Sequence, residues 1–526
     1  MDQEIEFKFE VPPEHLETLR AKHALGAEEV KLQARYFDTA DHALADAGLV
    51  LRLRKEGGRW VQTAKAAGRG PLERLEHNVD LGVGSEAPHA DLQRHHGTRI
   101  GRLLEEVVQT PDPLVETIAT DIVRLQRIVQ ENDSRIEVSL DVGHVTASGG
   151  EADAKRAPVC ELELELKAGN MADLAVLARR WTEEHPLWLS TVSKAGRGER
   201  LLGKSPTAVK ASSVAFPRRR AHLDGSEVQR LIVSSCLAQM LPNASEIAAG
   251  SLDATFVHQL RVGIRRLRTA LRELEDLWPG AFDPAWETPL KRAFDALGKS
   301  RDRELLQTQM QPRLEELGGP AVDLPPPEPC KPLDQVVRAS EFQCLLVELI
   351  GFASGGSCAQ GESGARGADA ESARAIPPDE VGLPQMKGPE EPASPSQTRQ
   401  LLAKRLNSLH KKVARGGKDF PDLSVDEQHR VRKRLKRLRY LAEFVGPLFR
   451  RGRAQEYVEG LEPAQDALGD FNDKHVALVS YRVLTASDPR AWFAVGWLSS
   501  TVEVDADTCR VAIQRIAHSD RFWRRG

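Results

Sequence analysis

The sequence predicts an α+β protein made of two consecutive parts, a strand-rich N-terminal part and an all-helical C-terminal part. Three observations predict this class. Before about residue 205, apolar and charged residues alternate in several short segments, which is the period of a β-strand. From about residue 224 the apolar period becomes that of a helix and stays so. A chain of 526 residues is also too long for a single core.

The first predicted strand contains the pentapeptide Glu-Ile-Glu-Phe-Lys. Its side chains alternate between two faces, so Glu4, Glu6 and Lys8 share one face and apolar residues line the other. A solvated charged face is ordinary for one strand. The pattern recurs, however, in Leu-Arg-Leu-Arg at 51–54 and in Glu-Leu-Glu-Leu-Glu-Leu-Lys at 161–167. Several strands with one apolar and one charged face predict a sheet curled around a charged lumen.

The other elements of this part follow from the same alternation and from turns marked by glycine and proline. Two helices are predicted, at 12–24 after a Pro-Pro pair and at 171–184. The predicted strands are 3–10, 32–38, 48–55, 59–66, 73–81, 122–130, 135–141 and 160–167.

The domain organisation follows from changes in composition. Residues 205–222 lack apolar periodicity and predict a linker between a first domain, 1–204, and a helical domain, 223–526. Within the helical domain, 352–397 is rich in Gly, Ser, Ala, Pro and Glu and nearly lacks large apolar residues. Such a segment buries too little surface to offset the entropy of ordering it. We expect it to be a disordered low-complexity insertion.

The helical domain contains an internal repeat. Residues 258–268 align with 429–439, and the later Leu-Gly phrases at 297–298 and 468–469 are displaced by the same 171 residues. Two independent phrases with one offset predict two related helical halves.

Each repeat carries a basic stripe on one helix face, because the charged residues recur at spacings of three and four. A solvated face is the ordinary interpretation for one helix, but such faces usually include acids, since like charges at this spacing repel by about 0.2–0.5 kcal/mol per pair. Two stripes without acids predict a polyanion partner, and the arginine fork suits phosphate. The stripes are His258, Arg261, Arg265, Arg268 and His429, Arg432, Lys436, Arg439.

The nature of that polyanion is narrowed by what the stripes lack. Apart from Tyr440 they carry no interleaved aromatic residue, and no helix-turn-helix or zinc-finger spacing is present, which argues against nucleic acid. Neither histidine has a second metal ligand at a suitable spacing on its helix. Hydrogen bonding to the anion and a buried structural role remain alternatives for both.

A charged lumen needs a ligand, since buried charges are costly unless they are paired or bound to metal. Carboxylates suit divalent cations and bases suit phosphate oxygens. The sequence has no P-loop, no G-x-G-x-x-G after a strand and no nucleophile elbow, so the common nucleotide and hydrolase signatures are missing.

These residues resemble two known families. The first domain resembles the CYTH, or triphosphate tunnel, family in its E-x-E-x-K motif at 4–8, L-R-L-R-K at 51–55 and Glu-Leu-Glu-Leu-Glu-Leu-Lys at 161–167. Shorter matches are Thr-Ala-Lys65, Thr-Asp-Ile-Val-Arg124, Ile-Glu-Val-Ser-Leu-Asp141 and Ser-Lys194. The helical domain resembles the CHAD domain.

The resemblance implies a closed, antiparallel, eight-stranded β-barrel that binds a linear triphosphate, with Mg²⁺ or Mn²⁺ as cofactor. The implied phosphate-binding residues are Lys8, Arg52, Arg54, Lys65, Arg124 and Lys194. The implied metal ligands are Glu4, Glu6, Asp141, Glu161 and Glu163.

We therefore expect a metal-dependent inorganic triphosphatase, a phosphoric anhydride hydrolase acting on triphosphate or polyphosphate, whose helical domain binds polyphosphate. The expected catalytic residues are Glu4, Glu6, Lys8, Glu161 and Glu163. One alternative is a non-catalytic protein that binds polyphosphate and targets it. Another is a triphosphatase or cyclase acting on an organic triphosphate, such as thiamine triphosphate or ATP.

Bulk properties set the expected location. The formal net charge is -4, so bulk charge predicts no partner. The six cysteines are scattered without a C-x-x-C pair, which favours a reducing compartment. No run is apolar enough to span a bilayer, and no signal peptide precedes the first strand. We expect a cytoplasmic protein that does not bind membranes.

Overall fold

The structure is a computed structural model, and it describes most of the chain. The described residues are 3–68, 73–108, 113–147, 155–324, 331–355, 389–449 and 451–524.

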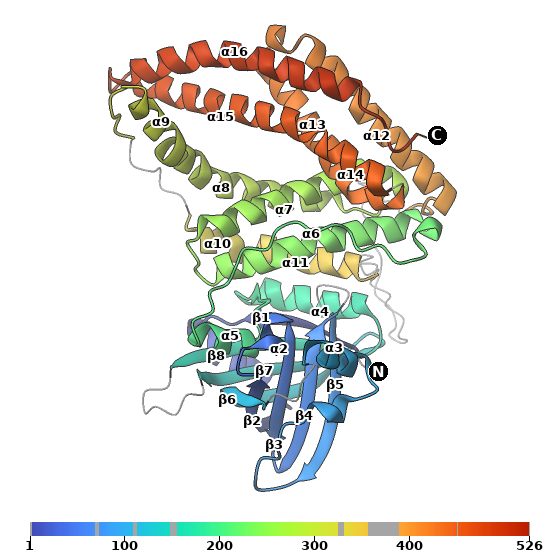
Figure 1. Ribbon diagram of the computed structural model, residues 1–526. Coiled ribbons are helices and arrows are strands. Elements are labelled where there is room, and N and C mark those ends of the chain that lie inside the picture. Colours follow the sequence, from blue (N-terminus) through green and yellow to red (C-terminus); the bar gives the residue numbers. More distant parts are fainter. Residues whose placement is uncertain are drawn as a thin grey trace, which may run out of the picture.

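The N-terminal domain is built on nine strands (Figure 1), and each predicted strand is confirmed. The strands are β1 (Gln3–Glu10), β2 (Glu28–Asp38), β3 (Leu49–Glu56), β4 (Arg59–Ala67), β5 (Glu73–Val83), β6 (Val115–Glu131), β7 (Ser134–Ala147), β8 (Arg156–Ala168) and β9 (Trp188–Leu189).

Helices of this domain are α1 (Leu16–His23), α2 (Ala43–Asp46), α3 (Arg99–Val107), α4 (Met171–Glu184) and α5 (Lys194–Leu201). The predicted helix at 171–184 is confirmed as α4. The one predicted at 12–24 is a short 3-10 turn, Pro13–His15, followed directly by α1.

The strands close into an antiparallel barrel, as the sequence predicted. The order is β5-β4-β3-β2-β6-β7-β8-β1, and β1 also pairs with β5, which closes the ring. The short β9 pairs with β1 on the edge that faces away from β8. The register places Lys8 opposite Glu163 and Glu6 opposite Glu165, so the charged faces of β1 and β8 coincide.

The apolar face of these strands points outward and is covered. Phe7 and Phe9 of β1 and Leu164 of β8 have no exposed surface, and they pack with Leu174 and Leu177 of α4. Burial of each such side chain contributes about 1.5–3 kcal/mol. The alternation that turns these residues outward turns the charged residues into the lumen.

The C-terminal domain is all helical. Its helices are α6 (Gly225–Ala248), α7 (Ala254–Glu273), α8 (Glu287–Leu305), α9 (Gln311–Glu316), α10 (Leu333–Arg338), α11 (Ser340–Ala353), α12 (Pro395–Lys418), α13 (Val425–Val445), α14 (Arg451–Glu459), α15 (Glu462–Leu484) and α16 (Ala491–Ala517).

The repeat of the sequence is a repeat of helices. The helices α6, α7 and α8 of the first half correspond to α12, α13 and α15 of the second. Equivalent helices begin alike: α6 has a capping box of Asp224 and Glu227, and α12 has one of Ser394 and Gln397. The halves meet where α7 packs against α13.

The first helical half lies against the barrel, and the second lies away from it (Figure 1). Helix α4 lies between the barrel and α11. The apolar residues at this boundary belong to one continuous cluster, which runs from Phe9 and Leu174 to Leu237 and Ile350. The two domains therefore share a core.

The predicted linker, 205–222, runs over the surface of the helical domain and is hydrogen-bonded to it. The Val209 amide donates to Asn243 Oδ1 at 3.2 Å, and Asn243 Nδ2 donates to the Val209 carbonyl at 2.9 Å. The predicted insertion, 352–397, lies mostly outside the described residues, and its two ends belong to α11 and α12. Across the described ranges, no helix combines the length and apolar character that crossing a bilayer requires.

Candidate active site

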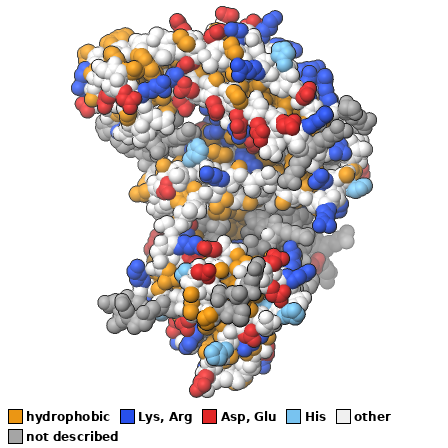
Figure 2. Space-filling view, in the orientation of Figure 1, with side chains coloured by type: hydrophobic (Ala, Val, Ile, Leu, Met, Phe, Trp, Pro, Cys, Tyr) orange, Lys and Arg blue, Asp and Glu red, His pale blue; other side chains and the backbone are white. Residues whose placement is uncertain are grey.

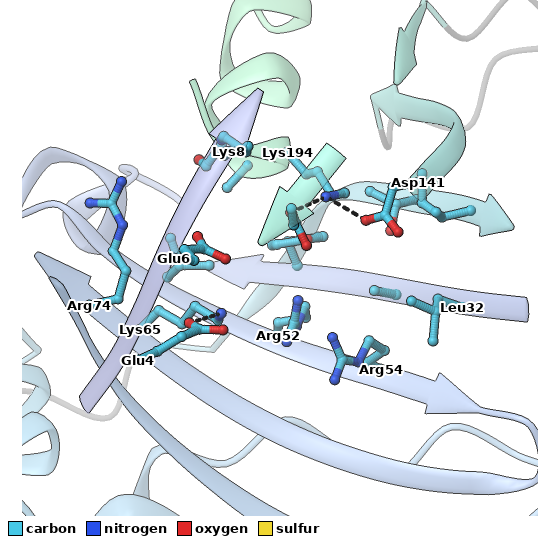
Figure 3. A pocket seen from close by; sticks show the side chains of 18 of the residues that line it. Glu4, Glu6, Lys8, Leu32, Arg52, Arg54, Lys65, Arg74, Asp141 and Lys194 are labelled. Carbon is cyan, nitrogen blue, oxygen red and sulfur yellow. Dashed lines mark hydrogen bonds and ion pairs between the residues drawn. The ribbon is translucent and has the colours of Figure 1, made fainter. Parts of the chain in front are cut away.

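The barrel encloses a charged cavity of about 390 Å³ (Figure 3). It adjoins a second cavity of about 420 Å³ nearer the β3–β4 turn, and the two share Glu4, Arg54, Lys65 and Arg124 in their walls. The lumen is therefore continuous along the barrel. Predicted residues that line the first cavity are Glu4, Glu6, Lys8, Arg52, Arg54, Lys65, Arg124, Asp141, Glu163 and Lys194.

Glu161 is the predicted residue that does not line the cavity. Its side chain has no exposed surface and is held from two sides. Lys194 Nζ lies 2.8 Å from one carboxylate oxygen, and Arg197 Nη2 lies 2.9 Å from the other. Glu161 thus lies behind the wall that Glu163 and Lys194 form.

Three carboxylates gather at the β7–β8 side of the lumen. Oxygens of Asp141, Glu161 and Glu163 lie within 4.8 Å of one another. Lys194 Nζ contacts all three, at 2.9, 2.8 and 2.9 Å. Arg124 forms a bidentate pair with Asp141, at 2.6 and 2.7 Å, and also bonds to Glu163. Predicted phosphate ligands and predicted metal ligands thus neutralise each other here.

The pKa shifts in this group follow from that pairing. Burial alone would lower the pKa of Lys194, but the attraction of the three carboxylates is larger and raises it well above its usual range. Burial would raise the pKa of Glu163, but Lys194 and Arg124 hold it well below its usual range. Lys194 and Glu163 are therefore charged at neutral pH.

A second group lies on the opposite wall, between β1, β4 and β5. Lys65 Nζ lies 2.8 Å from Glu4 and 2.6 Å from Glu76. Burial, together with a hydrogen bond between the two carboxyls, raises the pKa of Glu4 to about 8, and that of Glu76 is lowered. The pair therefore shares one proton at neutral pH. Burial and the nearby Glu163 likewise raise the pKa of Glu6.

The two arginines of β3 line the lumen, and each has a hydrogen-bond donor that is not satisfied within the described residues. The Nε atoms of Arg52 and Arg54 are buried and have no hydrogen-bond acceptor among the described residues. Buried donors in native proteins almost always find a partner, so an unsatisfied pair on one strand face indicates a missing acceptor. Two adjacent guanidinium groups suit an anion with several oxygens.

Sequence reasoning assigned no role to Arg197 and Glu10, which lie beside the lumen, and it counts Arg74 only among the reserve candidate cations of the first domain. Arg197 of α5 joins Glu161 to Glu10, and Arg74 of β5 lines the cavity near Lys8. Alternation along β1 puts Glu10 on the face of Lys8, so its position could have been inferred. Arg197 could not, because nothing in the sequence indicates that α5 packs against the barrel.

The donor set fits a hard divalent cation. Such ions take carboxylate oxygens, and Asp141, Glu161 and Glu163 supply several within the reach of one ion. Glu4 and Glu6 are on β1, which pairs with β8, and line the same cavity as Asp141 and Glu163. In Figure 3, Glu6 and Lys8 lie along β1, and Lys194 points toward Asp141.

The basic stripes of the helical domain also converge. Two hollows, of about 950 and 980 Å³, adjoin between α7, α13 and α15 and share Arg265, Arg432 and Lys436; together we call them the basic groove. Each of the eight predicted stripe residues lines one hollow or both. Lys and Arg side chains are visible around the hollow beneath α15 (Figure 2).

Two arginines of the first stripe also have structural contacts. Arg261 is buried, donates to the Phe294 carbonyl at 2.7 Å and lies 4.4 Å from the centre of the Phe294 ring. Arg268 forms an ion pair with Glu287 of α8. A neighbouring helix thus supplies an acid that the stripe itself lacks. Arg265, Arg432 and Lys436 line both hollows.

Family comparisons agree with this division. Residues 2–198 match the model of the CYTH domain, and residues 231–480 match that of the CHAD domain. The chain therefore carries a CYTH domain followed by a CHAD domain, which confirms the resemblance seen in the motifs.

Individual relatives cover parts of the chain. An inorganic triphosphatase of Haemophilus influenzae is 33% identical over 207 residues, 38% of this chain and 54% of that protein. An uncharacterized protein of Mycobacterium tuberculosis is 27% identical over 302 residues, 55% of this chain and 54% of that protein. The chain thus spans about half the length of these curated relatives. The solved CHAD domain from the plant Ricinus communis is 22% identical and covers 60% of this chain and 99% of its own, with a TM-score of 0.42.

Proposed function

We propose that the protein is a metal-dependent inorganic triphosphatase, which hydrolyses a phosphoric anhydride bond of tripolyphosphate or a short polyphosphate inside the barrel. The observation that carries this proposal is the pair of buried Nε donors of Arg52 and Arg54. Neither donor has an acceptor among the described residues, and both arginines line a lumen that also holds carboxylates. A triphosphatase relative supports the same reaction class.

The side chains of the lumen would bind and orient the substrate. Phosphoryl transfer depends mainly on positioning and on neutralising charge. Arg52 and Arg54 offer planar donors to phosphate oxygens from β3, and Lys8 and Lys194 offer ammonium groups from the other side. Cations on opposite walls hold a linear anion extended, and the closed barrel keeps bulk water away from it.

The carboxylates would hold Mg²⁺ or Mn²⁺, with Glu4 and Glu6 on one side and Asp141, Glu161 and Glu163 on the other. When bound, such an ion neutralises phosphate charge and lowers the pKa of a water molecule. Arg124 and Lys194 occupy the carboxylates in this structure. Substrate phosphates compete for the same two cations, so binding of the anion releases carboxylate oxygens for the ion.

A substrate panel tests the proposal. Purified protein with Mg²⁺ or Mn²⁺ is offered tripolyphosphate, long-chain polyphosphate, ATP and thiamine triphosphate, and released phosphate is measured. We expect tripolyphosphate to be the best substrate. Turnover of an organic triphosphate alone, formation of cyclic AMP, or binding without turnover would each replace the proposal by one of the alternatives.

Substitutions test the placement of the metal ligands. Glu4→Gln and Glu6→Gln keep the shape of the side chain but remove the carboxylate that would hold the ion, so both should abolish turnover while the fold is kept. Near-normal hydrolysis by both variants would refute this placement.

We further propose that the basic groove binds inorganic polyphosphate. Its cations come from two related helices, α7 and α13, and they line two adjoining hollows of about 950 and 980 Å³. A linear phosphate chain binds through charge and needs no aromatic side chain to stack on. The aromatic ring of Phe294 lies against the guanidinium groups of Arg261, Arg265 and Arg268.

A further inference from the structure

The segment 188–193 lies between the barrel and the helical domain and is bonded to both. Its inner edge belongs to the barrel. In β9, Leu189 pairs with Phe9 of β1. One residue further, the Ser190 amide donates to the Lys8 carbonyl at 2.9 Å. The segment thus forms a short edge strand that pairs with β1 through backbone hydrogen bonds.

The outer edge of this segment is bonded to side chains of the helical domain. The Leu189 amide donates to Gln343 Oε1 at 2.8 Å, and the Thr191 amide donates to Ser245 Oγ at 3.1 Å. Successive amides of an extended chain point to opposite edges, which is why these two point away from the barrel. Gln343 and Ser245 are 1% and 2% exposed, and Gln343 Nε2 donates to the Val337 carbonyl at 2.8 Å.

The same segment helps to position two lysines of the tunnel, Lys8 and Lys194. Lys8 Nζ donates to the Val192 carbonyl. Ser193 Oγ accepts from the Gly196 amide at 3.0 Å and so caps α5, whose first residue is Lys194. A shift of the segment therefore moves the acceptor that holds Lys8 and the helix that carries Lys194.

We propose that Ser245 and Gln343 are positioning residues of the tunnel, so that the helical domain fixes where the ammonium groups of Lys8 and Lys194 lie. Amides at the outer edge of an edge strand ordinarily face water. Here their acceptors, Gln343 and Ser245, are buried side chains of the helical domain. Loss of either acceptor would leave an amide donor without its partner, and we expect the segment to move in response. That the two lysines bind triphosphate rests on the proposed function; their positioning by the helical domain does not.

The interface offers a matched control. Ser340 also lies on the helical side, and its Oγ donates to the Thr182 carbonyl of α4 at 3.1 Å. Ser245→Ala and Ser340→Ala therefore remove the same group from the same interface, but only Ser245 touches the 188–193 segment. Ser245→Thr and Gln343→Glu keep an acceptor oxygen and serve as the conservative variants.

Steady-state hydrolysis of tripolyphosphate by the full-length protein gives the first readout. We expect Ser245→Ala and Gln343→Ala each to raise KM about fivefold with kcat changed less than about twofold, since positioning of binding groups acts mainly on substrate binding. The conservative variants should restore KM, and Ser340→Ala should leave it unchanged. Equal KM for Ser245→Ala, Gln343→Ala and the parent protein would overturn the proposal.

Hydrogen exchange gives a readout that needs no activity. Amides of 188–193 should exchange faster in Ser245→Ala and Gln343→Ala than in Ser340→Ala and the parent protein. If the parent protein hydrolyses no triphosphate, the proposed function fails, and exchange alone decides. Faster exchange then retains the positioning role, and equal exchange in all four proteins overturns it.

Discussion

The tunnel and the basic groove both gather arginine and lysine from separate elements, but they neutralise them differently. In the tunnel, fixed carboxylates stand within 3 Å of the cations, as at Lys194 and Lys65. In the groove, cations such as Arg268 and Arg439 are also paired with acids, but acids are fewer than cations among the lining residues.

This difference teaches what each site can discriminate. In the lumen, carboxylates already occupy the cations. An anion can bind these cations only if a divalent ion takes over the carboxylates, so the affinity of the lumen for an anion should depend on a divalent ion. A basic surface that is open to solvent binds any polyanion. Its affinity for the polyanion falls as salt rises, because counterions are released on binding. The predictions below separate these two behaviours.

Among the comparisons below, the largest effect is expected from a carboxylate of the group at β7 and β8. Glu163→Gln removes a charge that Arg124 and Lys194 both contact, and it should lower kcat/KM for tripolyphosphate by about 10²- to 10³-fold, as the loss of one preorganised electrostatic group does. Phosphate release measures it. Glu165→Gln, two residues along the same face, is the control and should cost less than about tenfold.

A second effect is expected in the groove alone. Arg265→Ala combined with Lys436→Ala should weaken binding of long-chain polyphosphate about tenfold and reduce the slope of log affinity against log salt by about 1 to 2. Calorimetric titration at several salt concentrations measures both. Lys411→Ala with Lys412→Ala removes the same charge from an exposed part of α12 and should change neither. Equal losses in both pairs would mean that only net charge matters.

The repeat offers a matched pair of glycines. A methyl group on Gly298 would lie 2.4 Å from Arg261 Nη1, whereas one on the equivalent Gly469 has nothing within 4 Å. We expect Gly298→Ala to destabilise the protein by about 1–3 kcal/mol through overpacking. Gly469→Ala should be neutral or stabilising, since alanine favours a helix over glycine by about 0.5–1 kcal/mol. Chemical denaturation measures both, and equal stabilities would contradict the role of Gly298.

The smallest effect concerns pH in the metal-free protein. Folding raises the pKa of Glu4 from its ordinary 4.5 to about 8, so the stability that this carboxyl contributes is fully present below pH 4.5 and is lost as pH rises through 8. The Tm should therefore fall by a few degrees between pH 7 and pH 9. Glu4→Gln mimics the neutral form and should show a smaller fall over the same range. A parallel decline in both proteins would assign the effect to other groups.

Much of the barrel could be predicted because alternation specifies which face a side chain occupies. Glu4, Glu6 and Lys8 on β1, and Arg52 and Arg54 on β3, all line the lumen for that reason. Alternation does not specify which strands become neighbours. The pairing of β1 with β8 decides that Lys8 lies opposite Glu163, and it joins residues more than 150 positions apart.

Other features depend on packing between elements and left no local signal. Glu161 alternates like Glu163, yet α5 covers it with Lys194 and Arg197. The basic stripe predicted Arg261 as a ligand residue, but the close approach of Gly298 lets Arg261 reach a backbone carbonyl and become buried. The contacts of Gln343 with 188–193 likewise arise only once the two domains meet.

Barrel closure has a consequence for how the protein is made. β1 is held between β5, β8 and β9, so the strand synthesised first must wait for partners that leave the ribosome much later. Among the described residues, its pairing with β5 spans Gln3 to Ile5. Glu4, Glu6 and Lys8 therefore meet Glu163 and Lys194 only after β8 and α5 have emerged, so the charged lumen forms late in synthesis, once the strands that close the barrel are available.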